Sequence, residues 1–147
     1  MTVKIGFVGT GGIANHHMRT LAEIPDAKMV AFCDLVEEKS LRAAKEYGGQ
    51  AYNHYQTMYD NEKLDAVYIC LPPFAHQEQE LAAIERGLPI FVEKPVATST
   101  DKASEISKAL VEKNLISAVG YHWRYMDTTA RAREYLGEEQ VGFALGS

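Results

Sequence analysis

Short apolar runs alternate with longer amphipathic stretches along most of the chain. The apolar runs predict strands at residues 3–8, 28–33, 51–52, 65–71, 89–92 and 116–120. The stretches between and after them have apolar residues at helical spacing, and predict helices at residues 13–22, 37–47, 55–59, 76–86, 101–114 and 127–136. Strands that alternate with helices indicate an α/β fold with a doubly wound, mostly parallel sheet.

Helical spacing also predicts which side chains of the first two helices pack against the sheet. They are Ile13, His17, Leu21 and Ile24 in the first helix, and Leu41, Ala44 and Tyr47 in the second. Thr100 directly precedes the helix at 101–114. A threonine hydroxyl at that position can act as an N-cap by accepting a bond from a free backbone N–H group.

A glycine turn joins the first predicted strand to the first predicted helix, with the sequence Gly-Thr-Gly-Gly-Ile-Ala at residues 9–14. Gly9 permits a tight turn, and Gly11, which has no Cβ, lets the backbone approach a diphosphate. Ala14 stands where a third glycine is usual and still allows the helix to pack closely on the strand. The diphosphate would bind at the helix N-terminus, where free N–H groups and the helix dipole favour anions. The alternative is an ordinary glycine turn of an α/β protein.

Asp34 directly follows the second predicted strand and lies 25 residues after Gly9. An acid about 20 residues after such a glycine turn accepts hydrogen bonds from the ribose hydroxyls of NAD. Its charge would repel the 2′-phosphate of NADP, and no arginine stands at residues 35–37 to compensate. Asp34 therefore predicts NAD rather than NADP. Its alternative role is an N-cap of the helix that follows.

The strand predicted at 65–71 ends in residues suited to a binding site. It runs through Leu71 into Pro72 and Pro73, and the two prolines make a rigid, extended crossing. Ligands of open α/β sheets bind at this carboxyl edge of the sheet. His76 follows, and two positions are open for it: in the cofactor cleft, or on the surface in the first turn of a helix.

The strand predicted at 89–92 ends in Glu93, Lys94 and Pro95. Two opposite charges at the end of a buried strand are costly unless they are paired or used. One interpretation is a structural ion pair between Glu93 and Lys94. The other is a lysine directed at a reacting centre, with the strand fixing its stem and the proline fixing the turn. The Lys94–Pro95 bond is also a candidate for a cis peptide bond.

The strand predicted at 116–120 leads into an aromatic and basic cluster, Tyr-His-Trp-Arg-Tyr at residues 121–125. One interpretation is a packed connection between two elements. The other is a wall against a planar ring, with Arg124 near a phosphate or a substrate. Because the cluster follows a strand end, it falls at the same edge of the sheet as the other motifs.

Composition and charge exclude several classes of protein. The chain of 147 residues has the length of one domain and a net charge of −5, and its lysines and arginines are scattered, which argues against a nucleic-acid partner. No apolar run reaches the ~18 residues of a membrane span. Cys33 and Cys70 each end a predicted strand, and we predict buried thiols in a cytoplasmic protein. No metal site is predicted.

Taken together, these motifs resemble those of the Gfo/Idh/MocA oxidoreductases, a family that includes glucose–fructose oxidoreductase and inositol dehydrogenase. The resemblance extends over the whole chain, which corresponds to the N-terminal half of such an enzyme. It is carried by residues 9–14, Asp34, residues 71–73 with His76, residues 93–95 and residues 120–125. Members of the family bind NAD or NADP in this domain and oxidise or reduce a sugar or a related polyol.

The resemblance implies that Lys94 lies near the nicotinamide and the substrate hydroxyl, and that residues 122–124 approach the nicotinamide half of the cofactor. With Lys94 as the catalytic residue, the predicted cofactor-binding residues are Gly9, Thr10, Gly11, Gly12, Ile13, Asp34, Leu71, Pro72, His76, Glu93, Lys94, His122, Trp123 and Arg124. The chain departs from the family at Phe74, where an asparagine often stands.

The family also has a second domain, an α/β unit with a large, mostly antiparallel sheet that supplies the substrate pocket, an Asp–His pair and the oligomer interface. The chain ends soon after residues 141–145, which predict the start of another strand. We therefore expect residues 1–120 to form the dinucleotide-binding core. Residues 121–147 are expected to form a cofactor-facing loop, a helix and the start of a truncated second domain. The complete enzyme is expected to be a homo-oligomer.

The sequence thus predicts the cofactor domain of an NAD(P)-dependent oxidoreductase that transfers a hydride to or from a CH–OH group, inactive without its second domain. The alternative is a non-catalytic, redox-sensing module that binds a dinucleotide. The Glu-Lys-Pro sequence favours the enzyme, because a sensor needs no lysine at the nicotinamide. A methyltransferase also has a glycine turn and an acid after the second strand, but its last strand is antiparallel.

Overall fold

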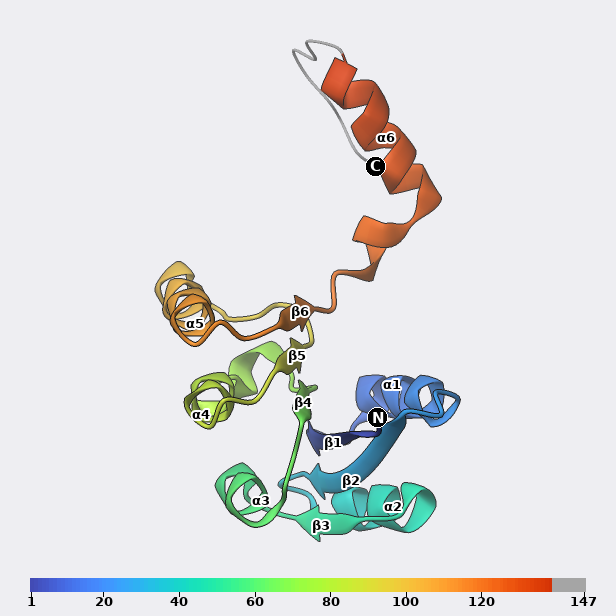
Figure 1. Ribbon diagram of the computed structural model, residues 1–147, viewed down its shortest axis with the longest axis vertical. Helices are drawn as coiled ribbons and strands as arrows, with labels where there is room; N and C mark the ends of the chain where they lie inside the picture. The colour runs from blue at the N-terminus through green and yellow to red at the C-terminus, as the bar shows by residue number, and fades with distance from the viewer. Residues whose placement is uncertain (139–147) are drawn as a thin grey trace.

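The computed structural model describes residues 1–138, which fold around one six-stranded sheet (Figure 1). The strands are β1 (Val3–Val8), β2 (Ala27–Cys33), β3 (Gln50–Tyr52), β4 (Ala66–Ile69), β5 (Ile90–Val92) and β6 (Ser117–Val119). Their order in the sheet is β3-β2-β1-β4-β5-β6, and all five neighbouring pairs are parallel. This is the order of a dinucleotide-binding α/β sheet. The parallel pairing of β6 with β5 also argues against the methyltransferase alternative.

Helices cover both faces of the sheet. They are α1 (Gly12–Ala22), α2 (Glu37–Tyr47), α3 (Tyr55–Asn61), α4 (Gln79–Glu85), α5 (Thr100–Glu112) and α6 (Asp127–Glu138), with short 3₁₀ turns η1 (Pro73–Ala75) and η2 (His122–Tyr125). Figure 1 shows α1 and α2 on one face and α3, α4 and α5 on the other. The predicted doubly wound sheet is therefore confirmed. The helices change face between β1 and β4, and the crevice beyond the carboxyl ends of these strands is where such sheets bind ligands.

The core consists of two apolar layers, one on each face of the sheet. On one face, Ala14, Met18 and Leu21 of α1 pack with β1 and β2 around Phe7 and Phe32. The layer on the other face includes buried side chains of α3, α4 and α5. Central strands buried on both faces are apolar at nearly every position, which explains why the strands were readable in the sequence.

The predicted apolar faces of the first two helices are right in part. In α1, Leu21 is buried and the His17 ring packs against Phe91 of β5, as predicted, but Ile13 and Ile24 are each 46% exposed. Ala14 and Met18 complete the buried face of α1. In α2, Leu41 is 51% exposed, while the small residues Ser40 and Ala43 are buried and the predicted Ala44 and Tyr47 are partly buried against the core. Both helices contain more than one stripe of apolar or small residues.

Two predicted helix starts are also wrong. The helix predicted from His76 starts later: η1 ends at Ala75, and α4 begins only at Gln79. The Gln79 side chain bonds both the Gln77 N–H (2.7 Å) and the Ala75 carbonyl (3.1 Å), so it stabilises a non-helical link between them. The N-cap of α5 is Ser99, whose Oγ accepts the Lys102 N–H, and not Thr100.

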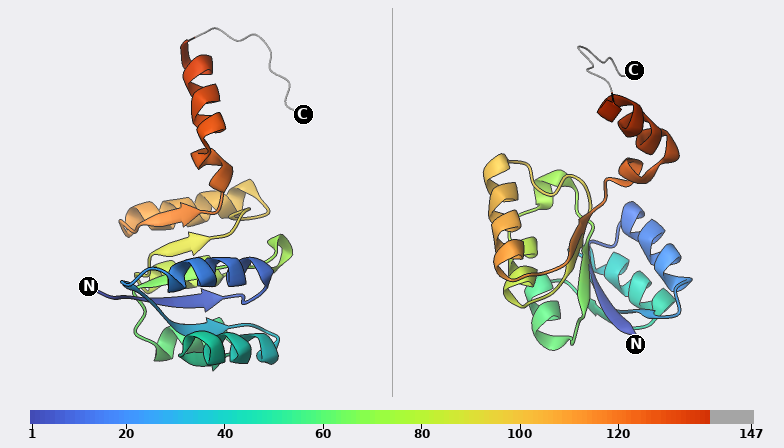
Figure 2. Two further views of the ribbon diagram at one scale, coloured as in Figure 1. Left: turned by 90° about the vertical axis from the view of Figure 1, so that its right-hand side faces the viewer. Right: turned by 45° about the horizontal axis from the view of Figure 1, so that its top comes forward.

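The chain leaves the sheet after β6. In both views of Figure 2, α6 extends away from the sheet instead of packing on it. Trp123 and Tyr125 in η2 are 71% and 79% exposed, as expected for a surface that a further domain would cover. The strand predicted at 141–145 lies outside the described residues. Within residues 1–138, no helix is long and apolar enough to cross a membrane.

Candidate cofactor-binding site

A cavity of about 660 Å³ opens at the carboxyl edge of the sheet, where β1, β2 and β4 end. Its size and mixed lining are typical of a small-molecule site. The strand-end residues that line it are Val8, Gly9, Gly11, Cys33, Asp34, Cys70, Leu71 and Pro72. Five of the predicted cofactor-binding residues thus meet in one place, although they come from distant parts of the sequence: Gly9, Gly11, Asp34, Leu71 and Pro72.

The glycine turn has two glycines with different roles. Gly9 has a φ of +86°, and a Cβ there would lie 2.3 Å from the Cys70 carbonyl oxygen, so only glycine fits. A Cβ at Gly11 would meet nothing within 4 Å, which leaves open space at the start of α1. Gly11 is also the N-cap of α1, and no side chain caps this helix end. The N–H groups there are therefore available to an anion.

Asp34 is held in the cavity wall by the glycine turn. Its Oδ2 accepts bonds from the N–H (2.9 Å) and the Oγ1–H (3.1 Å) of Thr10, and its Oδ1 accepts the Val36 N–H (3.0 Å). The N-cap of α2 is Val36, so the predicted alternative of Asp34 as N-cap is wrong. Thr10 is fully buried and orients the acid instead of lining the cavity. Gly12 is exposed at the start of α1, like Ile13, and neither lines this cavity.

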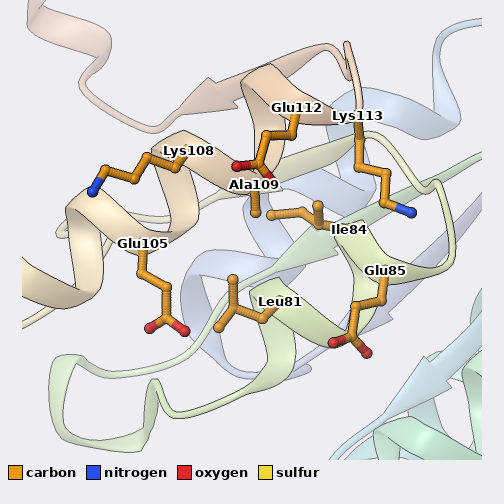
Figure 3. Close-up of a pocket in the computed structure, with 8 residues that line it drawn as sticks. All are labelled: Leu81, Ile84, Glu85, Glu105, Lys108, Ala109, Glu112 and Lys113. Atoms are coloured by element: carbon orange, nitrogen blue, oxygen red, sulfur yellow. The ribbon is translucent and has the colours of Figure 1, made fainter.

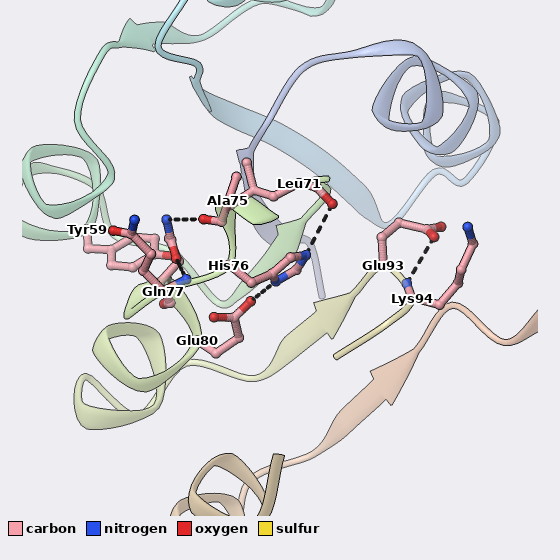
Figure 4. Close-up of polar contacts among 9 residues, drawn as sticks. Tyr59, Leu71, Ala75, His76, Gln77, Glu80, Glu93 and Lys94 are labelled. Atoms are coloured by element: carbon pink, nitrogen blue, oxygen red, sulfur yellow. Dashed lines mark hydrogen bonds and ion pairs between the residues drawn. The ribbon is translucent and has the colours of Figure 1, made fainter. Parts of the chain in front are cut away.

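His76 is not among the residues that line the cavity, and Figure 4 shows its ring between Leu71 and Glu80. Its side chain is 3% exposed, with Nε2 3.1 Å from the Leu71 carbonyl oxygen and Nδ1 2.5 Å from Oε1 of the buried Glu80. Burial disfavours the charged imidazolium, but the Glu80 hydrogen bond and charge outweigh it, so the pKa of His76 is raised. Neither of the two positions left open for His76 is found. It braces the segment that carries Leu71 and Pro72.

Lys94 projects from the end of β5 beside Glu93 (Figure 4). The predicted cis Lys94–Pro95 peptide bond is present. The side chain of Glu93 contacts His17 of α1, at 2.7 Å between Oε1 and Nε2, and forms no ion pair with Lys94. Among residues 1–138, no acid pairs with the Lys94 ammonium, which is exposed. The structural ion pair between Glu93 and Lys94 is therefore wrong, and the lysine is free to meet a ligand.

The aromatic and basic cluster does not reach this cavity. His122, Trp123 and Arg124 lie in η2, and all three are exposed. The rings of His122 and Trp123 pack edge to face, with centroids 6.2 Å apart. The role predicted for these residues at the nicotinamide stays a prediction.

Several cavity residues were missed in the sequence. Residues 53–56 at the start of α3 form one wall, and Lys39 of α2 lies in the lining with Asp34. The signal for residues 53–56 was their place directly after β3, another strand that ends at this edge. Lys39 had a weaker signal, because only the first turn of α2 brings it next to the acid. It is the one cation among the residues that line this cavity.

Both thiols at this edge are free and predicted to be unreactive in the folded chain. Burial raises the pKa of Cys33 to about 12, with a contribution from Asp34, and burial with the Glu93 charge does the same for Cys70. At pH 8 we expect alkylation by iodoacetamide to be at least ~100-fold slower than in urea, since only the thiolate reacts. Mass spectrometry over time measures both rates. Fast labelling of the native chain would contradict this expectation.

A second cavity, of about 410 Å³, lies between α4 and α5 (Figure 3). Leu81, Ile84 and Ala109 form its apolar part, and charged residues of both helices surround it. It lies between two helices instead of at the carboxyl edge of the sheet, and none of its residues was predicted as part of a site.

Comparisons with known proteins agree with the fold. Residues 3–121 match the family model described as the GFO_IDH_MocA oxidoreductase family, NAD-binding Rossmann fold. The chain is 32% identical to an inositol 2-dehydrogenase/D-chiro-inositol 3-dehydrogenase of Shouchella clausii, across 99% of the chain and 43% of that enzyme. It is 28% identical to glucose-6-phosphate 3-dehydrogenase of Bacillus subtilis, across 97% of the chain and 40% of the enzyme.

Among solved structures, the chain resembles scyllo-inositol dehydrogenase of Lactobacillus casei with bound NAD(H) and scyllo-inositol. The TM-score is 0.84 at 27% identity, with 97% of this chain and 43% of that one covered. The chain thus spans less than half the length of these relatives. Strand order, glycine turn and family match agree, and the chain belongs to the Gfo/Idh/MocA oxidoreductase family, of which it is the NAD-binding Rossmann domain.

Proposed function

We propose that this chain is the cofactor-binding part of an enzyme that transfers a hydride between NAD and a CH–OH group of a sugar or polyol. The observation that carries the proposal is the convergence of the glycine turn and Asp34 on one cavity, with the unpaired Lys94 on the same edge of the sheet. The named relatives support it, because they are dehydrogenases of inositols and of glucose 6-phosphate.

The residues present fit a dinucleotide. The uncapped N-terminus of α1 and the open space at Gly11 suit a diphosphate, because N–H groups and the helix dipole there attract negative charge. Asp34 has lone pairs left beyond its three bonds and would accept from ribose hydroxyls. The wall at residues 53–56 and Leu71 would enclose the adenosine half.

Lys94 would act on the substrate hydroxyl. Bound NAD supplies the carbon that accepts or donates the hydride. In oxidation the hydroxyl proton must leave as the hydride departs to NAD. Lys94 Nζ would polarise the O–H bond or accept that proton. The strand end and its backbone bond to Glu93 orient the lysine, while the second domain of the complete enzyme would hold the substrate.

We predict tighter binding of NAD than of NADP. Repulsion of a 2′-phosphate by Asp34 amounts to about 1–4 kcal/mol for charges ~4 Å apart. Lys39 opposes this, because it lines the same cavity. We expect Asp34→Asn, which keeps the shape of the acid, to reduce the difference in affinity between NAD and NADP. Lys39→Ala should increase that difference. Titration calorimetry with both cofactors measures the difference in affinity between NAD and NADP for the unmodified chain and for each of the two variants. An equal or tighter affinity for NADP in the unmodified chain would contradict the assignment.

The proposed function is tested by two measurements on the 147-residue chain. Calorimetry should detect NAD binding, and a panel of sugars and polyols should yield no NADH. Positioning of a substrate contributes about 7–11 kcal/mol to catalysis, and this chain provides only part of the site. Absence of NAD binding would overturn the proposal. Steady NADH production would show that the chain suffices alone. Binding with no turnover in a protein of the relatives' full length would favour the redox-sensing alternative.

We further propose a cytoplasmic location, because two free buried thiols are typical of a reducing compartment. A homo-oligomeric complete enzyme also stays a prediction. We place no nucleic acid or membrane among its partners. Residues 121–138 are the part of the described chain that we expect to continue toward the second domain.

A further inference from the structure

Glu93 lies where four parts of the fold meet: β4, β5, α1 and the segment that follows β6. The backbone N–H of Glu93, at the end of β5, donates to the Ile69 carbonyl of β4 (2.8 Å). Its Oε1 lies 2.7 Å from Nε2 of His17 in α1, and its Oε2 accepts the Lys94 N–H (3.1 Å). After β6, a Cβ at Gly120 would lie 2.8 Å from Oε1, so glycine leaves the space that the carboxylate fills. These contacts hold the buried carboxylate in one orientation.

His17 is held as firmly as its partner. Its ring packs edge-on against Phe91 of β5, with centroids 4.9 Å apart, and near Tyr68 of β4 at 5.8 Å. An ionised carboxylate only accepts hydrogen bonds, so Nε2 of His17 is the donor. Among the ion pairs of residues 1–138, His17 is the only partner of Glu93. The position of the carboxylate therefore depends on α1.

We propose that His17 is a positioning residue, which through Glu93 fixes the backbone of Lys94 against helix α1. The effect of this positioning on catalysis rests on the proposed function, in which α1 would hold the cofactor diphosphate and Lys94 would face the reacting carbon. The pair of His17 and Glu93 then joins the two ends of the cofactor site directly, across 76 residues of sequence.

Stability alone does not explain a polar pair at this place. Replacing two hydrogen-bonded partners by apolar groups of the same shape can be nearly neutral or stabilising, and the rings of Phe91 and Tyr68 already offer an apolar surface at this point. An apolar side chain at position 17 would fill the space but would leave Oε1 of Glu93 without a donor. What the histidine adds is the orientation of the carboxylate, and with it the bond to the Lys94 N–H.

The test compares His17→Gln with His17→Asn. The glutamine amide nitrogen lies as far along the side chain as the histidine Nε2, whereas the asparagine nitrogen stops short of the carboxylate. We expect NMR hydrogen exchange of the Lys94 amide to accelerate about 10- to 100-fold in His17→Asn, the effect of losing a bond to a charged group. In His17→Gln, the exchange rate of the Lys94 amide should stay within about threefold of its rate in the unmodified chain. The Val67 amide, in the core of β4, should be unchanged in both.

Two results would overturn the inference: equal Lys94 exchange in both variants, or equal acceleration at Lys94 and Val67, which indicates a purely structural pair. The exchange needs no cofactor, so a chain that fails to bind NAD would defeat the proposed function while this measurement still decides the role of His17. In a protein of the relatives' length, His17→Asn should lower kcat about tenfold or more with little change in KM for NAD, and His17→Gln should restore it.

Discussion

Lys94→Ala is expected to lower turnover by about 10²- to 10⁴-fold in a protein that joins this chain to the second domain, the usual contribution of a positioned acid–base group. The affinity for NAD should change much less, because the cavity that would hold the cofactor lies along β1, β2 and β4 and does not include the Lys94 side chain. Steady-state kinetics with an inositol, together with calorimetry on the 147-residue chain, measures both quantities.

Lys94→Arg separates the charge of the lysine from its ability to take a proton. Arginine keeps a positive charge but is not deprotonated in proteins, so it can polarise a hydroxyl and cannot act as a base. If Lys94 moves the proton, the arginine variant stays nearly as inactive as the alanine variant. Recovery of turnover in Lys94→Arg would assign a purely electrostatic role. A parallel loss of NAD affinity and turnover in Lys94→Ala would contradict the catalytic role.

Gly9→Ala is expected to destabilise the fold by at least about 2 kcal/mol. Left-handed backbone costs an alanine roughly 1–2 kcal/mol, and forced overpacking adds about 1–3 kcal/mol. Both apply here, because Gly9 has a φ of +86° and its Cβ would meet the Cys70 carbonyl at 2.3 Å. Urea unfolding followed by circular dichroism measures the free energy of unfolding. An unchanged unfolding midpoint would contradict the described turn.

Gly11→Ala is the matched control from the same turn. Its Cβ meets no protein atom within 4 Å, and the residue has a φ of −76°, so stability should be unchanged or slightly raised. The new methyl group would occupy space that we assign to the diphosphate, and we expect NAD affinity to fall about tenfold or more. Normal NAD affinity in Gly11→Ala would place the diphosphate elsewhere.

Most of the fold and the edge that carries the site could be predicted from the sequence. All six strands were found from apolar runs. The signal was clearest for the central strands, because a strand buried on both faces needs an apolar side chain at nearly every position. The glycine turn was readable because φ above zero and a close backbone approach both exclude other residues at Gly9. Asp34, Leu71 and Lys94 each follow a strand, and parallel strands end at one edge.

The partners of the polar side chains could not be predicted. An ion pair of Glu93 with its neighbour Lys94 was one of two interpretations, yet Glu93 pairs with His17, 76 residues away. His76 was placed in a cleft or on the surface, yet it is buried against Glu80. Nothing in the sequence marked Glu80 as a buried partner. The faces of α1 and α2 were only partly right: Ile13, Ile24 and Leu41 are exposed, because helical spacing alone does not say which of several apolar stripes meets the sheet.

The sequence by itself thus determined the order of strands and helices and the edge of the sheet where chemistry gathers, since these depend on local periodicity and on what glycine and proline allow. Only the tertiary structure decided which groups touch at that edge: Thr10 with Asp34, His17 with Glu93, and Lys39 in the cavity wall. Hydrogen bonds and ion pairs act over about 3 Å, so their partners are set by how the layers pack and not by distance along the chain.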